Sequence, residues 1–373
     1  MAKRFLKAYP HAASRIIEDS EDARRQLYNA ESNNPKHHIF ITSAKGDHFK
    51  VCPGTEKPYL CCYYWTLHQA TNCPYDCTYC ILQYYLNNPL LTVYANTDEL
   101  MDQIRVRIRK EPQRLFRIGT GELADSLALD DIALVGPELI RFAARQKNMI
   151  LELKTKSCKV DHLLDVPHDG KTVISWSLNP PDRIGRHEFY AADLSGRMQA
   201  LRKVQNAGYM TGFHFDPMLM YADQEAGYGY LAKTLFEHAD PAHIAWISIG
   251  SLRFPPEMAE KVRSKFPATD LLDGEMIRGR DNKQRYFKPL RINMYKNLYR
   301  CLRKYGGEDL FIYFCMEDAA VWKQVMGFAP DSNEHLDYLF AEHLFRKFPQ
   351  LDLPVPELRK YREFESKRSW ESG

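Results

Sequence analysis

The chain has 373 residues, 45% of them hydrophobic and 12% aromatic, which is ample for a large buried core. This length exceeds the usual size of one domain, so we expect one barrel-like domain of roughly 200–250 residues with terminal extensions rather than two equal halves. Charged residues make up 27%, but the formal net charge is only +3. The whole chain is therefore not an obvious polyanion binder, and any nucleic-acid site must rest on local charge.

The sequence has neither the pattern of a membrane span nor that of a signal peptide. No apolar run approaches the roughly 18–20 residues that a span needs, and residues 1–15 lack an apolar stretch. We expect a cytoplasmic protein with no membrane partner. Nine cysteines in such a chain argue against a disulfide framework, and six of them fall between positions 52 and 80, which points to metal.

The expected elements begin with a helix around residues 11–31 and a strand over His38–Thr42, both in an N-terminal extension of residues 1–57. Strand and helix patterns then alternate through six units, within residues 58–270. The six expected strands are short runs rich in β-branched and aromatic residues. They are Tyr63–Gln69, Leu115–Gly119, Met149–Thr155, Thr172–Leu178, Tyr209–Asp216 and Ile244–Gly250.

Four of the helices between these strands have clear signals. One is capped by Thr97, one begins at Pro137, and two carry apolar stripes over residues 194–204 and 258–266. This alternation implies a parallel sheet with right-handed crossovers, in either an open six-stranded barrel or a doubly wound sheet. In both folds the chemistry lies at the carboxyl ends of the strands.

The alternation stops after residue 270. Residues 271–295 are basic, and residues 296–373 form an α-rich C-terminal extension that contains one strand, Asp309–Phe314. The tail over residues 357–368 is expected to be a charged helix or disordered.

Three cysteines, Cys73, Cys77 and Cys80, follow the first strand with spacings of three residues and then two. A structural zinc site needs four ligands, and no fourth Cys or His follows at finger spacing. A cubane cluster has four irons, so three cysteines leave one iron open to a small molecule. The alternative is a structural zinc or iron–sulfur site with Cys61 or Cys62 as the missing ligand.

A C-x3-C-x2-C loop after the first strand of such a series resembles the radical S-adenosylmethionine (radical SAM) superfamily. The resemblance implies a [4Fe–4S] cluster that binds S-adenosylmethionine and, on one-electron reduction, yields a 5′-deoxyadenosyl radical. The segment Ile118–Glu122 is similar to the superfamily's Gly-Gly-Glu element, which implies that Gly121 and Glu122 receive the cofactor's amino group. Tyr79 corresponds to the aromatic residue that packs by the adenine. The alternative for the Ile118–Glu122 segment is an ordinary turn, and the alternative for Tyr79 is a tyrosine of the core.

Further segments resemble one branch, the spore photoproduct lyase family, through roughly residues 58–295. They are Cys80–Gln83, Leu91–Asn96, Lys154–Lys156, Val160–Leu164, Ser175–Pro180, Ala207–Tyr209, Gly212–Pro217 and Arg285–Lys288. The resemblance implies a partial (β/α)6 barrel of the α/β class and an electron donor such as flavodoxin or ferredoxin. It also implies a DNA repair lyase: the radical takes hydrogen from a thymine dimer photoproduct, the cross-link fragments, and a cysteine returns a hydrogen.

By the same matching, Lys156, Ser177 and Asn179 stand where the family contacts the cofactor. A lysine and two small polar residues at strand ends suit a carboxylate and ribose hydroxyls. The alternative is ordinary hydrogen bonding at strand ends.

Two residues depart from the family's pattern. Glu122 stands where the family has its hydrogen-donor cysteine, and Ile81 replaces a tyrosine. A carboxylate O–H bond is too strong to give up a hydrogen atom readily. The chain therefore recruits another donor or performs a different reaction, and we expect a relative that acts on another lesion or modified base. Candidate donors are Cys52, Cys61, Cys62 and Cys315, each of which is alternatively a buried structural thiol.

A basic segment supports DNA as the partner, with duplex DNA that contains a lesion as the expected form. Between Gly274 and Arg291 lie six basic residues against two acidic ones, with Tyr286 and Phe287 interleaved. Basic groups neutralise phosphates, and aromatic rings stack on a base that must leave the helix. The expected DNA contacts are Arg280, Arg285, Tyr286 and Lys288; the alternative is a solvated charged loop.

Two residues of the fifth strand, His214 and Asp216, share one face because strand side chains alternate. If that face is inward, both side chains point into the barrel, and we expect them to belong to a substrate pocket; the alternative is a satisfied core pair. We also expect an ion pair between Glu188 and Arg197.

Two other functions remain open at this point. One is radical chemistry on RNA, a peptide or a small metabolite. The other is a non-enzymatic nucleic-acid-binding protein with a structural metal.

Overall fold

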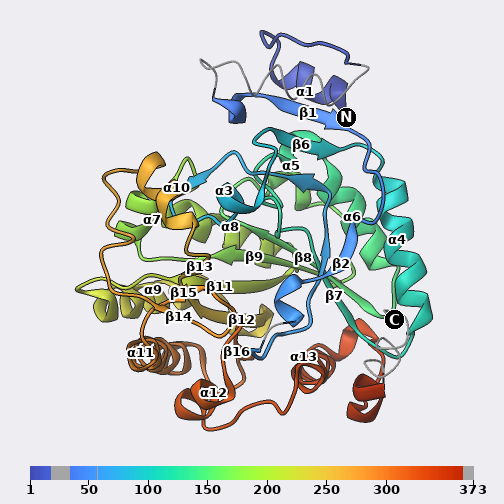
Figure 1. Cartoon of the computed structure of the whole chain (residues 1–373). Coiled ribbons are helices and arrows are strands. Elements are labelled where there is room, and N and C mark those ends of the chain that lie inside the picture. The colour runs from blue at the N-terminus through green and yellow to red at the C-terminus, as the bar shows by residue number, and fades with distance from the viewer. Residues whose placement is uncertain (18–33, 57, 364–373) are drawn as a thin grey trace.

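A computed structural model describes residues 1–17, 34–56 and 58–363 (Figure 1). Its central feature is one eight-stranded sheet in the order β16-β12-β11-β9-β8-β7-β3-β2. The strands are β2 (Phe49–Val51), β3 (Trp65–Leu67), β7 (Phe116–Gly119), β8 (Met149–Thr155), β9 (Thr172–Ser177), β11 (Met210–Met218), β12 (Ile244–Ser251) and β16 (Ile312–Phe314). All neighbours are parallel except β2, which is antiparallel to β3.

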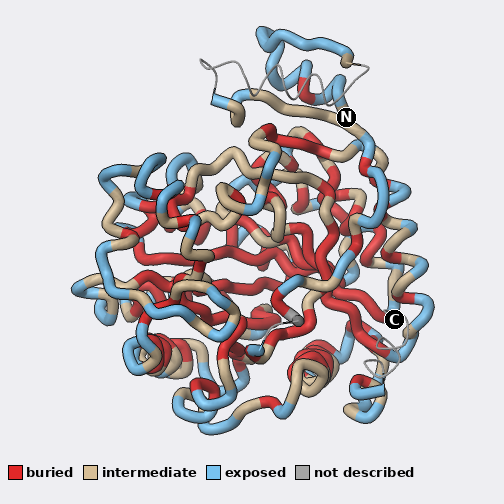
Figure 2. The backbone as a smooth tube through the Cα atoms, in the orientation of Figure 1, coloured by how far each residue is buried: buried red, intermediate tan, exposed pale blue. Residues whose placement is uncertain are grey.

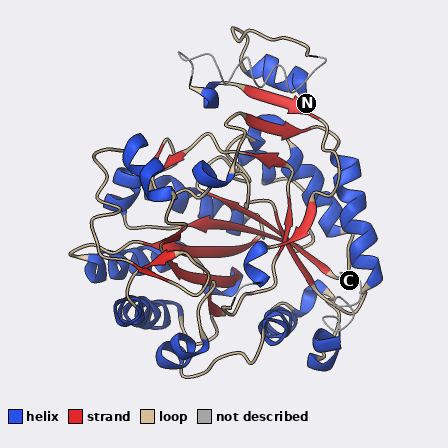
Figure 3. Cartoon of the chain, in the orientation of Figure 1, coloured by secondary structure: helices blue, strands red, loops and turns tan. Residues whose placement is uncertain are grey.

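The sheet curls into a partial barrel, as Figure 3 shows by the fan of strands inside the helices. This confirms the expected fold class, and each of the six expected strands has a counterpart. The sheet is wider than the six expected strands because β16 and β2 form its two edges, although we assigned these segments to the C-terminal and N-terminal extensions. An isolated antiparallel bridge joins Leu60, before β3, to Glu317, after β16, so the two sides of the barrel meet there.

Helices cover the outer surface of the sheet and bury one face each, as the red inward sides in Figure 2 show. They are α4 (Thr97–Lys110), α6 (Val135–Ala144), α8 (Leu194–Asn206), α9 (Gln224–His238), α10 (Met258–Lys265), α11 (Lys288–Gly306), α12 (Ala319–Met326) and α13 (Asn333–Lys347). In α4, acidic residues lie in the first turn and basic ones in the last, which suits the helix dipole.

The helix starts differ slightly from the sequence expectation. Asn96 rather than Thr97 occupies the N-cap position of α4, because the Thr97 hydroxyl instead donates to Glu138 Oε2 at 2.6 Å. Helix α6 begins at Val135, two residues before Pro137.

Strand β1 (Ile39–Thr42) of the N-terminal extension belongs to a second, small sheet, in the order β1, β6 (Leu91–Tyr94) and β4 (Ala70–Thr71), whose other two strands come from the barrel region. A short helix, α1 (Ala2–Ala8), precedes it, and Arg4 ties the extension to the barrel by donating to the Ala133 carbonyl at 2.8 Å. The helix expected around residues 11–31 is absent from residues 11–17, and the rest of that range lies outside the described residues.

The remaining elements are short and connect the larger ones. They are α3 (Leu82–Tyr85), α5 (Asp130–Ala133), α7 (Pro181–His187), β5 (Asp76–Cys77), β10 (Glu188–Phe189), β13 (Arg253–Phe254), β14 (Ile277–Arg278), β15 (Gln284–Arg285) and the 3-10 turns η1 (Pro35–His37), η2 (Pro53–Glu56), η3 (Asp161–Leu163), η4 (Pro241–His243) and η5 (Pro349–Leu351). No helix in the described part of the chain is long and apolar enough to cross a membrane.

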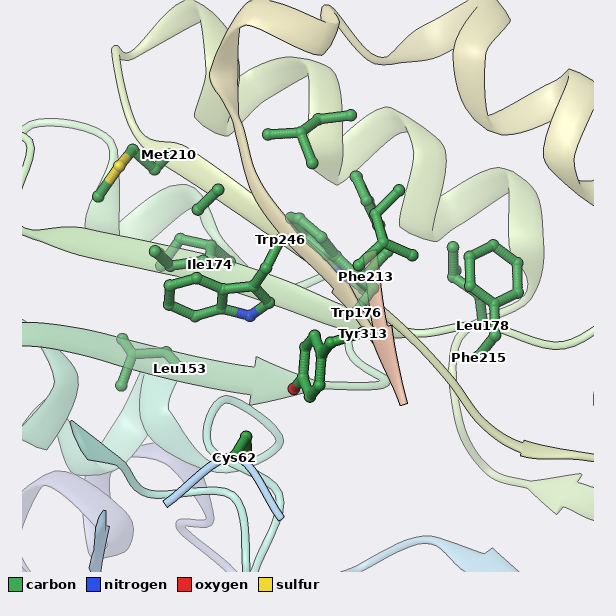
Figure 4. Close-up of a cluster of buried hydrophobic side chains, with 14 of the residues drawn as sticks. Cys62, Leu153, Ile174, Trp176, Leu178, Met210, Phe213, Phe215, Trp246 and Tyr313 are labelled. Atoms are coloured by element: carbon green, nitrogen blue, oxygen red, sulfur yellow. The ribbon is translucent and has the colours of Figure 1, made fainter. Parts of the chain in front are cut away.

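The core is built from large apolar side chains on the sheet, several of which Figure 4 shows together. Trp176, Phe213 and Phe215 are fully buried. His214, between the two phenylalanines, faces the other side of β11, where it meets Glu152 of β8. The alternation expected in this strand is therefore present, and it leaves polar side chains inside the barrel.

Candidate active site

Three cysteines lie together on the loop that follows β3 and β4. Cys77 is buried, and Cys73 and Cys80 are half-buried. Burial raises the pKa of Cys73, and the charges of Asp125, Cys77 and Cys80 raise it further, so the three sulfurs share one environment. The loop is fixed because Cys77 pairs with Glu188 across the β5–β10 ladder.

This set of donors fits a four-iron cluster. In the described residues, no group of three or more His, Cys, Asp or Glu side chains could hold a single metal ion. A cubane is larger than one ion, so its three thiolates lie farther apart than those of a zinc site. Cys61 and Cys62, the candidates for a fourth ligand, lie buried before β3, and the Cys62 carbonyl accepts a hydrogen bond from Arg117. Three thiolates with no fourth protein ligand leave one iron available to a small molecule.

Beside the triplet lies a group of polar side chains centred on Glu188, all buried except the half-buried Lys156, which we call the Glu188 network. Its members are Tyr79, Lys156, Ser177, Asn179, Glu188 and Arg197. The expected ion pair between Glu188 and Arg197 is confirmed, and both side chains are completely buried. Although burial opposes it, Arg197 and then Lys156 hold the pKa of Glu188 below its ordinary value.

The other members of the Glu188 network surround this pair. Tyr79 donates its hydroxyl hydrogen to Glu188, and Asn179 Nδ2 donates to Glu188 Oε1 at 3.2 Å. The Arg197 guanidinium donates to the Ser177 carbonyl at 2.8 Å. The Lys156 ammonium lies 5.6 Å from the centre of the Tyr79 ring. Four residues that the sequence assigned to cofactor binding are thus brought together, with Glu188 as the hub that the assignment lacked.

Asp125 fixes the backbone between the triplet and this network. Its Oδ1 accepts from the Leu127 and Ala128 amides at 3.0 and 2.9 Å, and its Oδ2 accepts from the Lys156 amide at 2.7 Å. An aspartate that follows a strand end and precedes a turn is the kind of sequence signal that could have identified this role.

The two glycines of the expected Gly-Gly-Glu-like segment make room for the chain's own side chains. A Cβ at Gly119 would lie 1.5 Å from the Tyr64 hydroxyl, and one at Gly121 would lie 2.9 Å from the Lys154 Cβ. Close packing against tyrosine and lysine therefore explains both glycines without a ligand.

A second group of polar side chains lies across the barrel, and we call it the Lys154 network. Its members are Glu122, Glu152, Lys154, His214, Asp216, Arg253 and Cys315. The ammonium of Lys154 contributes to lowering the pKa of three carboxyl groups, those of Glu122, Glu152 and Asp216. These side chains come from β8 and β11 and from the segments that follow β7, β12 and β16.

Glu122 is an ionised carboxylate in this network. Its Oε2 lies 2.8 Å from His68 Nε2, and its side chain keeps 24% of its exposure. Burial would raise its pKa, but hydrogen bonds from His68 and Thr66 hold the pKa below the ordinary value. Glu122 therefore supplies a negative charge rather than a transferable hydrogen atom.

Glu152 and His214 form the buried floor of the Lys154 network. His214 Nε2 lies 2.7 Å from Glu152 Oε1, Trp246 Nε1 donates to the same oxygen at 3.2 Å, and Tyr64 donates to the other. Against the effect of burial, His214 lowers the pKa of Glu152 to about 2. His214 and Asp216 face inward as expected, but each is paired with a residue other than its neighbour on β11.

Cys315 is the member of the Lys154 network that lies next to the edge strand β16. The Arg253 guanidinium donates to Asp216 Oδ1 and Oδ2 at 2.9 and 3.1 Å and contacts Cys315 Sγ at 3.2 Å. Burial raises the pKa of Cys315 far above its ordinary value, so the thiol keeps its hydrogen at neutral pH. Arg253 and Lys154 were missed as site residues because nothing in the sequence indicates which strand ends converge.

The structure corrects two of the expected DNA contacts. Arg285 is only 2% exposed, and its guanidinium is bound to Asp281 Oδ2 at 2.6 Å and lies over the Tyr59 ring. Tyr286 is 3% exposed, and its hydroxyl accepts from the Met220 amide. Both are interior residues, because each has a partner in the fold that composition could not place.

The exposed part of the basic segment is the β14–β15 hairpin, which pairs with β13. Arg278 and Arg280 are exposed there, as is Phe287 just beyond. Lys288 is half-buried, with its ammonium 2.7 Å from Asp318 Oδ2. Burial and then the nearby Arg253 charge lower the pKa of Lys283, which places this missed lysine next to the Lys154 network.

Comparisons with known proteins agree with this geometry. A family model described as spore photoproduct lyase matches residues 54–301. Curated relatives include spore photoproduct lyases from Geobacillus sp., 29% identical over 62% of this chain and 67% of that protein, and from Bacillus subtilis, 30% identical over 56% and 62%. A solved spore photoproduct lyase variant with bound AdoMet and dinucleoside spore photoproduct has a TM-score of 0.68 at 25% identity, and covers 81% of this chain and 88% of its own. Because the family model matches about two thirds of the residues, the chain belongs to the spore photoproduct lyase family and is a radical SAM lyase.

Proposed function

We propose that this chain is a DNA repair lyase that uses its radical on a damaged or modified base other than the spore photoproduct. The observation that carries the proposal is the contrast at the barrel mouth. The Glu188 network beside the cysteine triplet contains Lys156, Ser177 and Asn179, which the sequence resemblance assigns to the cofactor, whereas the same matching puts Glu122, an ionised carboxylate, at the position of the family's donor thiol. Formation of the radical is then shared with the family, whereas the return of a hydrogen atom to the product is not.

The cofactors are a [4Fe–4S] cluster and S-adenosylmethionine, which supply a 5′-deoxyadenosyl radical when bound. Cys73, Cys77 and Cys80 would hold three irons. Lys156, Ser177 and Asn179 would meet the carboxylate and hydroxyl groups of S-adenosylmethionine, and Tyr79 would pack by its adenine. Burial of Tyr79, Asn179 and Glu188 keeps water from this side of the barrel, which would protect a radical from side reactions.

Cys315 is the proposed hydrogen donor. Its thiol is buried and protonated, and the Arg253 contact holds it at the carboxyl end of β16. The carbon radical left after the cross-link or modification breaks would take the hydrogen atom of the S–H bond and form a C–H bond. The sulfur of Cys315 would be left as a thiyl radical, which must regain a hydrogen atom before the next turnover.

The Lys154 network would bind the base. It presents an acceptor in Glu122 and donors in Lys154 and Arg253, a mixture that can match the N–H and C=O groups on the edge of a nucleobase. Arg278 and Arg280 on the exposed hairpin would bind phosphates, and Phe287 offers an exposed ring for stacking.

Anaerobic reconstitution tests the proposal. With four irons per chain and dithionite as reductant, we expect 5′-deoxyadenosine to form with S-adenosylmethionine, and to form at least tenfold faster with irradiated DNA than with undamaged DNA. The control is the Cys77→Ala variant, which should form none. Stimulation by RNA, a peptide or a metabolite fraction but not by DNA would overturn the DNA assignment, and one tightly bound zinc in place of iron would overturn the radical chemistry.

A second arm identifies the substrate. Oligonucleotides with single defined lesions would replace irradiated DNA, with the spore photoproduct among them. We expect a lesion other than the spore photoproduct to give the highest yield of repaired product. Highest yield on the spore photoproduct would contradict the altered specificity.

A further inference from the structure

A tyrosine outside the Glu188 network, Tyr228 of α9, makes a direct hydrogen bond to one member of that network. Its hydroxyl donates to Asn179 Oδ1 at 2.8 Å and accepts from the Leu219 amide at 2.7 Å. Asn179 in turn donates from Nδ2 to Glu188 Oε1 at 3.2 Å. The loop after β11, helix α9, the segment after β9 and strand β10 are therefore joined by one continuous chain of hydrogen bonds.

The two ends of this chain determine where its hydrogen atoms lie. The Leu219 amide can only donate, so the Tyr228 oxygen accepts there and has its single hydrogen left for Asn179. Although burial opposes it, Arg197 holds the pKa of Glu188 below its ordinary value, and an ionised carboxylate can only accept. The Asn179 amide must therefore turn Nδ2 to Glu188 and Oδ1 to Tyr228.

This orientation determines what the Asn179 side chain can offer to a ligand. Its two Nδ2 hydrogens are directed to Glu188 Oε1 at 3.2 Å and to the Tyr79 hydroxyl at 3.4 Å. An amide oxygen can accept two hydrogen bonds, and among the described residues Tyr228 is the only donor to Oδ1. Asn179 thus has a lone pair to offer rather than a hydrogen, which suits a hydroxyl group that donates.

The close approach of α9 to Asn179 is built into the packing. Tyr228 and Asn179 are both buried. A Cβ at Gly227 would overlap the Tyr221 hydroxyl and lie 3.4 Å from Pro180 Cγ, so a glycine there lets the helix lie against the segment that follows β9. Burial raises the pKa of Tyr228 well above its ordinary value, so the hydroxyl keeps the hydrogen that it donates.

A second tyrosine offers an internal comparison. The Tyr286 hydroxyl accepts from the Met220 amide at 3.1 Å, one residue beyond Leu219. Tyr228 and Tyr286 are each 3% exposed. The two hydroxyls therefore hold adjacent amides of the same loop, and of the two, Tyr228 is the one that also donates to Asn179.

We propose that Tyr228 is a positioning residue for S-adenosylmethionine, because it holds the Asn179 amide in the orientation in which Oδ1 can accept a hydrogen bond from a ribose hydroxyl of the cofactor. The inference rests on the proposed cofactor role of Asn179 and goes beyond it, since Tyr228 acts through Asn179. Without the Tyr228 hydroxyl, the amide can rotate about its Cβ–Cγ bond, and Oδ1 loses its fixed direction.

The test compares affinities for S-adenosylmethionine. The reconstituted parent protein, Tyr228→Phe, Tyr286→Phe and Asn179→Ala would be measured by anaerobic equilibrium dialysis, without DNA or reductant. Loss of the directing hydrogen bond should weaken binding by Tyr228→Phe about fivefold, whereas Tyr286→Phe should stay within about twofold of the parent. Both tyrosine variants keep the ring and lose the acceptor of one amide, so their iron content and melting temperature should change alike.

Cofactor analogues that lack one ribose hydroxyl give a readout that a purely structural role would not move. With either the 2′-deoxy or the 3′-deoxy analogue of S-adenosylmethionine, we expect the parent and Tyr228→Phe to bind equally well, because the hydroxyl that donates to Asn179 is then missing. A difference between the two proteins that persists with both analogues would overturn the inference.

The remaining outcomes separate the inference from the proposed function. Unchanged affinity in Tyr228→Phe together with weaker binding by Asn179→Ala would overturn the positioning role and leave the cofactor role of Asn179 intact. Equal weakening in Tyr228→Phe and Tyr286→Phe would mean that the hydroxyls act through the loop rather than through Asn179. Unchanged affinity in Asn179→Ala would overturn its cofactor role, and the inference with it.

Discussion

The two polar networks of the barrel differ in how far their side chains are exposed and in how well the sequence predicts them. In the Glu188 network, the central ion pair is completely buried and each member binds another member. In the Lys154 network, Glu122 and His68 keep 24% and 17% of their side-chain exposure. One network is a finished internal structure, whereas the other presents charges at an opening. The proposed cofactor side is thus built around a fully buried ion pair, whereas the proposed substrate side keeps partly exposed charges.

The largest expected effect tests the cysteine triplet, on which both networks depend. Cys77→Ala removes one of three cluster ligands, so we expect less bound iron and at least a thousandfold loss of 5′-deoxyadenosine formation. Iron content and the rate of S-adenosylmethionine cleavage are the measurements. Cys301→Ala, at a half-buried cysteine on α11, is the matched control. If Cys77→Ala and Cys301→Ala cleave S-adenosylmethionine at similar rates, the cysteine triplet does not hold the cluster.

The next effect concerns the stability that the buried ion pair of the Glu188 network gives to the fold. Glu188→Gln leaves Arg197 buried without its counter-ion, and breaking a buried pair in this way costs about 3–5 kcal/mol of folding free energy. Glu122→Gln removes a partly exposed carboxylate and should cost less than about 1 kcal/mol. Denaturant unfolding of the two variants gives the comparison. Equal losses of stability in the two variants would mean that Glu188 and Glu122 do not differ in how strongly burial makes the fold depend on them.

A smaller effect follows from the pKa of Glu152, which His214 lowers to about 2 in spite of burial. A carboxyl group whose pKa is lower in the folded state stabilises the fold above its unfolded pKa, and this contribution is lost as the pH falls from about 4.5 towards 2. The size is about 3 kcal/mol. The stability lost by Glu152→Gln should therefore shrink over that range, and a constant difference between pH 6 and pH 2.5 would contradict the assignment.

The smallest expected effect concerns DNA. Arg280→Ala removes an exposed charge, so binding should weaken severalfold and the slope of log K against log salt should fall by roughly one. Arg285→Ala is the informative contrast, because it removes a buried partner of Asp281 and should lower the melting temperature instead. Equal effects on salt dependence would restore the sequence-based assignment of Arg285.

The sequence predicts the barrel well because its signals are local. Each expected strand, such as Met149–Thr155, has its own apolar run and flanking turns, and the observed β8 has the same limits. The sequence also predicts β16 as a strand, over Asp309–Phe314, but its place at the edge of the sheet depends on its pairing with β12, and that of β2 on its pairing with β3. Length and periodicity carry no such information.

The residues of the site show the same contrast between local sequence signals and contacts that depend on the fold. Lys156, Ser177 and Asn179 of the Glu188 network occur in segments that resemble the family, so the resemblance finds them, whereas Glu188 and Arg197 lie outside those segments. The contact of Arg253 with Asp216 and Cys315 joins residues 37 and 62 positions apart, which only the fold brings together. Likewise Arg285 counts as basic in the sequence, but Asp281 neutralises it in the interior.

One measurement tests most directly the claim that the radical is made as in the family but completed by a different thiol. The parent protein and Cys315→Ala would be compared in a single turnover on the preferred DNA substrate, with 5′-deoxyadenosine and repaired product quantified together. We predict that the variant forms 5′-deoxyadenosine within twofold of the parent, while repaired product falls at least tenfold. Repaired product at the level of the parent would contradict the account.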